Sequence, residues 1–134
     1  MKENDQDTND QQRTNDQKSK RVFDLAERTA VFGENVIGLL KIVPINRITG
    51  PLVSQLVRCA TSVGANYCEA DEAATKKEFK YRIGVSRREA KETCFQLRML
   101  VAAYPECRDQ AKVLWQEAKE LVKIFASIAP RRSR

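Results

Sequence analysis

The chain has 134 residues, and its 24 Lys and Arg against 18 Asp and Glu give a net charge of +6. This length fits one domain. We expect a cytoplasmic protein, because no stretch approaches the roughly 20 apolar residues of a membrane span and the N-terminus lacks the apolar core of a secretory signal. Histidine is absent, which argues against Ser-His-Asp catalysis, Cys-His catalysis and histidine-based metal sites.

Residues 1–21 are predicted to form a disordered tail. Apart from Met1 this segment has no apolar side chain, so it cannot bury enough surface to offset the entropy cost of ordering. Its five basic and five acidic side chains cancel, which leaves the whole positive excess on residues 22–134. A basic folded domain favours polyanionic partners, although many such domains bind none.

The rest of the chain is predicted to form four helices, over about residues 22–43, 51–72, 76–103 and 106–129, and then a basic tail, 130–134. Pro44, Pro105 and Pro130 mark helix ends, and Thr75 with Glu78 forms a capping box. Each helix has apolar residues at helical spacing, and no segment alternates as a strand does. We therefore expect an all-α, up-down antiparallel four-helix bundle over residues 22–129. The last helix is predicted to carry a regular apolar stripe of Ala111, Leu114, Trp115, Ala118, Leu121, Val122 and Phe125.

Several small residues are predicted to serve packing. Gly64 lies inside the second helix, where it either lets a neighbouring helix approach closely or is simply tolerated. The four cysteines form no Cys-x-x-Cys pair, so we expect them to be reduced and mostly buried.

Polar side chains flank the core stripes of the two middle helices. Arg58, Ser62 and Glu69 lie on one flank of the second helix, and Glu89 and Glu92 on one flank of the third. We interpret them as an interhelical network that fixes helix register or a subunit contact, and expect Arg58→Ala to cost about 3 kcal/mol if the carboxylates are buried. The alternative is a set of catalytic carboxylates, but no nucleophile, metal site or phosphate-binding loop accompanies them.

The third helix carries a row of cations, Lys80, Arg87, Lys91 and Arg98. Their spacing places them within about 40° of one another over about 27 Å of the helix. Such a row can neutralise phosphates without reading sequence. The alternative is a solvated face whose arginines pair with Glu117 or Glu120 of the fourth helix. No exposed aromatic residues are interleaved with the row, so it does not resemble a base-stacking platform.

The third helix also has a second apolar face, opposite its core stripe. This face contains Tyr81, Val85, Phe95 and Met99. One bundle interior cannot receive both faces, and the surplus apolar surface predicts an oligomer interface.

These residues form a recognisable pattern. Gln55-Leu-x-Arg58-x-x-x-Ser62-x-x-Ala65-Asn66-x-x-Glu69-Ala70, followed by Glu89-Ala90-x-Glu92-Thr93, resembles the small bacterial ribosomal RNA intervening-sequence protein family. The resemblance extends over about residues 23–125, and the chain is also similar in design to the accessory variability proteins of diversity-generating retroelements. The signature positions that it implies are Gln55, Arg58, Ser62, Asn66, Glu69, Glu89 and Glu92.

The resemblance implies a left-handed bundle that assembles as a ring, usually a homopentamer, with no established enzyme activity. The retroelement relatives imply binding of nucleic acid and of a reverse transcriptase through a basic ring surface. Many relatives carry a Tyr-Trp pair where this chain has Cys94-Phe95, which leaves the partner open.

Two functions remain open from the sequence. The first is a non-enzymatic, oligomeric bundle that binds RNA or DNA non-specifically through Lys80, Arg87, Lys91 and Arg98. The alternative is a structural or adaptor ring that binds another protein, such as a reverse transcriptase, with no direct role at nucleic acid. We expect no enzyme activity, no cofactor, no metal and no membrane partner.

Overall fold

The computed structural model describes residues 25–130. The predicted N-terminal tail, 1–21, lies outside the described residues, as does the predicted C-terminal tail, 130–134, except for Pro130. Four long helices are seen: an N-terminal helix over residues 25–40, α2 (Thr49–Asp71), α3 (Lys76–Ala103) and α4 (Arg108–Ile128). A short 3₁₀ helix, η2 (Pro105–Cys107), precedes α4. Within this range there is no strand, and the predicted all-α four-helix bundle is confirmed. None of these helices combines the length and the apolar character that crossing a membrane requires.

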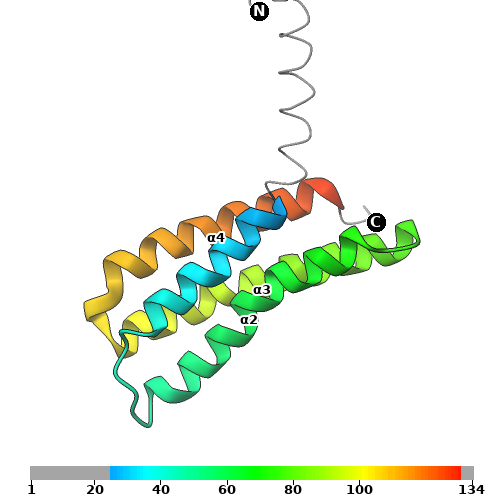
Figure 1. Cartoon of the computed structure of the whole chain (residues 1–134). Coiled ribbons are helices and arrows are strands. Elements are labelled where there is room, and N and C mark those ends of the chain that lie inside the picture. Colours follow the sequence, from blue (N-terminus) through cyan, green and yellow to red (C-terminus); the bar gives the residue numbers. More distant parts are fainter. Residues whose placement is uncertain (1–24, 131–134) are drawn as a thin grey trace, which may run out of the picture.

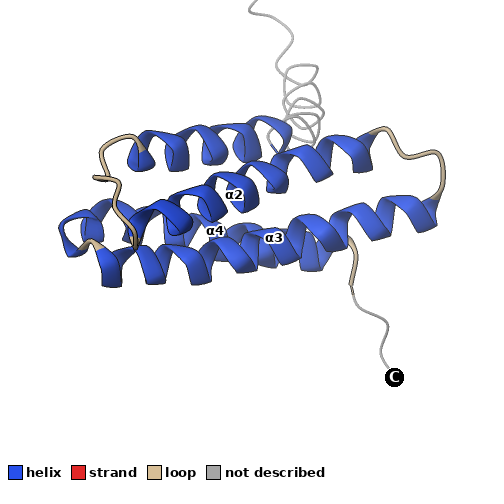
Figure 2. Cartoon of the chain, turned by 90° about the horizontal axis from the view of Figure 1, so that it is seen from below, coloured by secondary structure: helices blue, strands red, loops and turns tan. Residues whose placement is uncertain are grey.

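Each helix lies beside the next along the chain, and the fourth returns to the first (Figures 1 and 2). The N-terminal helix meets α2 at Gly64, where an added Cβ would lie 3.1 Å from Oγ1 of Thr29. It meets α4 through Arg28, whose guanidinium donates to the carboxylate of Glu117. Gly64 therefore permits a close approach of two helices, one of the two roles left open for it.

The helix ends follow local hydrogen bonding. The N-terminal helix ends at residue 40, before the predicted 43, because the amides of Ile42 and Val43 donate to carbonyls three residues back, those of Leu39 and Leu40, rather than four. Helix α2 begins two residues before Pro51, because the side chain of Asn46 accepts hydrogen bonds from the amides of Ile48 (2.8 Å) and Thr49 (2.9 Å). An asparagine in this position satisfies amides that the helix itself leaves unpaired.

The predicted bounds of α3 agree with the structure at both ends. The hydroxyl of Thr75 accepts from the amide of Glu78 (3.0 Å), as expected of the capping box. Helix α4 starts at Arg108 rather than at 106, because residues 105–107 form the 3₁₀ turn.

The apolar stripes meet in one core. Its largest fully buried apolar side chains are Phe32, Phe125, Leu56, Ile83, Leu97, Leu100, Leu121, Val36 and Val63. Buried hydroxyls are satisfied by helix carbonyls: Ser86 donates to Val63 (2.9 Å) and Thr93 donates to Glu89 (2.7 Å). Trp115, a member of the predicted apolar stripe of the last helix, remains 36% exposed at the edge of α4 that faces α3.

Candidate functional site

Helices α2 and α3 are joined by a polar cluster of four predicted signature residues. Arg58 donates to Glu89 (2.9 Å) and also to Glu92. The amide of Gln55 donates to Glu92 (2.7 Å). These hydrogen bonds raise the pKa of Arg58 above its usual value, so its guanidinium stays charged. The cluster links two helices at fixed register, in the arrangement expected of an interhelical network.

The cluster is less buried than the sequence-based estimate assumed. The side chain of Arg58 is 47% exposed, against 34% for Glu92 and 15% for Glu89. Solvent screens ion pairs at this degree of exposure. The expected cost of about 3 kcal/mol for Arg58→Ala assumed buried carboxylates, and this condition is not met in the single chain.

The other three signature residues lie elsewhere on α2. The amide of Asn66 donates to the carbonyl of Ser62 (2.9 Å) and accepts from Arg82 of α3 (3.1 Å). Glu69 is exposed and takes part in neither group. Six of the seven signature residues therefore take part in two contacts between α2 and α3, and the carboxylate of Glu69 stands apart from both.

The cysteines are free, and three of them are at least partly shielded from solvent. Burial raises the pKa of the thiols of Cys59, Cys94 and Cys107. A raised pKa lowers the thiolate fraction at neutral pH, which makes these thiols poor nucleophiles. Cys68 is exposed, against the expectation of burial. Within residues 25–130, no three Cys, Asp or Glu side chains gather as metal ligands would.

The second apolar face of α3 is open to solvent in the single chain. Tyr81 is 60% exposed and Phe95 57%, while Val85 and Met99 are half-buried. Glu92 lies on the same side of the helix, so the polar cluster borders this face. The predicted interface residues thus form a partly exposed apolar surface, with the guanidinium of Arg82 over the ring of Tyr81, 5.7 Å from its centroid.

The predicted cation row is exposed along another side of α3. Lys80, Lys91 and Arg98 are exposed and Arg87 is half-buried. None of them forms an ion pair with another residue of the described chain. The predicted alternative partners are engaged elsewhere: Glu117 pairs with Arg28, and Glu120 with Lys123 (3.5 Å).

Helix α4 adds cations that the sequence analysis did not select. Cys94 of α3 donates to the carbonyl of Trp115 (3.9 Å), which places this edge of α4 beside the row. Arg108, Lys112 and Lys119 share the edge with Trp115, at the helical spacing i, i+4, i+7 and i+11. This spacing was readable in the sequence, but only the packing shows that the edge adjoins the row on α3. We call the combined surface the basic face; its residues are Lys80, Arg87, Lys91, Arg98, Arg108, Lys112 and Lys119.

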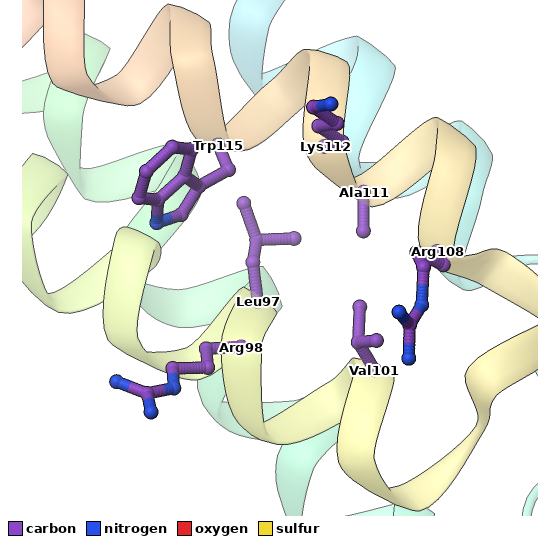
Figure 3. A pocket seen from close by; sticks show the side chains of 7 residues that line it. All are labelled: Leu97, Arg98, Val101, Arg108, Ala111, Lys112 and Trp115. Carbon is purple, nitrogen blue, oxygen red and sulfur yellow. The ribbon is translucent and has the colours of Figure 1, made fainter.

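An open groove of about 360 Å³ crosses the basic face between α3 and α4. Its apolar lining comes from Leu97, Val101 and Ala111, and Trp115 stands at one end with Arg108 at the other (Figure 3). The remaining lining residues are Arg98 and Lys112. The groove therefore combines an apolar interior with cationic side chains.

The fold and its polar signature define a small four-helix-bundle protein. The model of the 23S rRNA-intervening sequence protein family matches residues 21–127, and the chain belongs to this family. The predicted family is thereby confirmed.

A solved structure shows the same fold. It is the crystal structure of a protein of unknown function from the S23 ribosomal protein family of Bacteroides thetaiotaomicron VPI-5482. The two chains are 23% identical, with a TM-score of 0.70, over 80% of this chain and 99% of the other. Among curated proteins, no match was found.

Proposed function

We propose that this protein is a non-enzymatic, self-associating bundle that binds RNA or DNA through the phosphate backbone, without reading sequence. The observation that carries the proposal is the basic face, whose seven cations come from two adjacent helices and form no ion pair among residues 25–130. Cations that neutralise phosphates release condensed counterions, which supplies most of the affinity in non-specific binding.

Charge segregation on the two helices supports the proposal. Glu89 and Glu92 of α3 are turned toward α2, where Arg58 binds them. On α4, Glu117 is nine residues from Arg108, about 180° round the helix, and faces the N-terminal helix through Arg28. These three carboxylates are thus each held by an arginine outside the basic face.

Self-association would multiply this surface. The exposed Tyr81 and Phe95 give α3 a face suited to a second copy, and the family resemblance implies a ring, usually of five copies. Copies of the basic face in one assembly would bind a long polyanion with an avidity that one chain lacks.

The test is binding of fluorescently labelled RNA and DNA by the wild type and by Arg87→Glu/Lys91→Glu. The matched control is Lys41→Glu/Arg47→Glu, which makes the same change of charge at two exposed residues outside the basic face. We expect loss of affinity in the first variant for every sequence tried, and near wild-type affinity in the control.

The second candidate is an adaptor ring that binds a protein, such as a reverse transcriptase, and makes no contact with nucleic acid. The exposed aromatic face of α3 favours it, because such surfaces also receive protein partners. Equal and weak nucleic-acid binding by the wild type and both variants would support the adaptor.

A further inference from the structure

The groove between α3 and α4 points to a more specific ligand than a phosphate backbone. We propose that it holds an unpaired nucleobase of a single-stranded nucleic acid beside Trp115, with the adjoining phosphates at Arg98, Arg108 and Lys112. This inference rests on the proposed function and adds that single strands are preferred to duplexes.

The lining of the groove matches the two chemical parts of a nucleotide. Leu97, Val101 and Ala111 offer apolar surface, which phosphate cannot use and an aromatic base can. Arg98, Arg108 and Lys112 supply positive charge around that surface. The volume of about 360 Å³ lies within the range of small-ligand sites, about 300–1,000 Å³.

Trp115 has the position and exposure that stacking requires. It lines the groove and is 36% exposed. Nζ of Lys119 lies over the indole, 4.3 Å from its centroid, so this cation occupies one face of the ring. We expect an incoming base to stack on the opposite face or to displace the lysine. Stacking of a base on an aromatic side chain contributes about 1–3 kcal/mol, and every base offers a face for it.

The arrangement favours a single strand over a duplex. In a duplex the bases are stacked inside, and only phosphates and groove edges reach the protein surface. A single strand can turn a base out and keep its phosphates on both sides of it. A duplex would therefore use the cations of the basic face and leave the apolar lining empty.

The chain contains one tryptophan, so its emission reports on the surroundings of Trp115. The probes are an oligouridylate of about 12 nucleotides, an abasic ribose-phosphate strand of equal length and an RNA duplex of equal length. We expect the oligouridylate to quench the emission, and the abasic strand and the duplex to bind with little quenching.

Substitution gives the second readout. Trp115→Ala should weaken binding of the oligouridylate about 5- to 150-fold, as loss of one stacked base implies, and change duplex binding by less than about twofold. Trp115→Phe should retain most of the affinity, because an aromatic ring remains. Val113→Ala, at an exposed position of α4 that does not line the groove, is the control.

Three results would overturn the inference. The first is oligouridylate binding that leaves the emission unchanged. The second is equal binding by the wild type and by Trp115→Ala with an intact thermal melt. Either result would exclude the base from the groove, whereas salt-dependent binding would still support the proposed function. Absence of binding by single strand and duplex alike would overturn both proposals.

Discussion

Arg28 and Glu117 close the bundle, with two hydrogen bonds of 2.7 and 2.8 Å between residues 89 positions apart. The pair joins the N-terminal helix to α4 and holds Glu117 on the flank of α4 away from α3. Glu117, one of the two carboxylates that the sequence suggested as partners of the cation row on α3, consequently does not pair with that row. The alternative pairing with Glu117 is wrong, and the basic face remains available to an external anion.

Loss of Arg58 should destabilise the chain modestly. Its two partners are partly exposed, so we expect Arg58→Ala to lower the free energy of unfolding by about 1 kcal/mol, between the values for exposed and buried pairs. Adding Glu89→Gln should recover part of the loss, because the less exposed carboxylate then needs no cation. Urea unfolding of the single and double variants measures both, and equal stability of Arg58→Ala and wild type would show that the cluster contributes nothing.

Gly64 should resist a substitution that other helical glycines accept. Alanine in place of glycine inside a helix gains about 1 kcal/mol when its methyl group meets open space. At Gly38 nothing lies within 4 Å of an added Cβ, whereas at Gly64 the Cβ would lie 3.1 Å from Oγ1 and 3.3 Å from Cβ of Thr29. We expect Gly38→Ala to raise the urea midpoint and Gly64→Ala to leave it unchanged or lower it. An equal gain at both positions would show that the helices can move apart freely.

The apolar face of α3 should mediate self-association. We expect light scattering to give a multiple of the 15.3 kDa chain mass. Phe95→Glu should reduce it toward a single chain, because a charge cannot be buried there without a partner. Val113→Glu changes an equally exposed apolar residue of α4 and should leave the mass unchanged. A wild type that stays monomeric at micromolar concentration would refute the interface.

The fold was predictable from local patterns. Thr75 with Glu78, and the prolines between helices, mark ends that depend on neighbouring residues alone, so α3 was bounded correctly. The starts of α2 and α4 lie two residues from the predicted positions, because the cap at Asn46 and the 3₁₀ turn after Tyr104 depend on loop conformation. Periodicity located the apolar stripes but does not show how far each side chain reaches into the core.

The candidate site was predictable only in part. The row from Lys80 to Arg98 lies on one helix, so helical spacing alone located it. Trp115 and Lys112 join it through the packing of α4 against α3, a long-range relation that spacing within either helix does not contain. Trp115 was assigned to an apolar stripe, and such a stripe does not distinguish its buried centre from its exposed edge.

The dependence of nucleic-acid affinity on salt tests the central claim most directly. For the wild type, log K against log salt should fall with a slope near −0.9 per phosphate contacted on duplex DNA. Arg87→Glu/Lys91→Glu should weaken binding for all sequences, make the slope shallower by about two units per chain and leave the melting temperature nearly unchanged. Lys41→Glu/Arg47→Glu should keep the wild-type slope. No wild-type binding at about 50 mM salt, or the same slope in both double variants, would contradict the account.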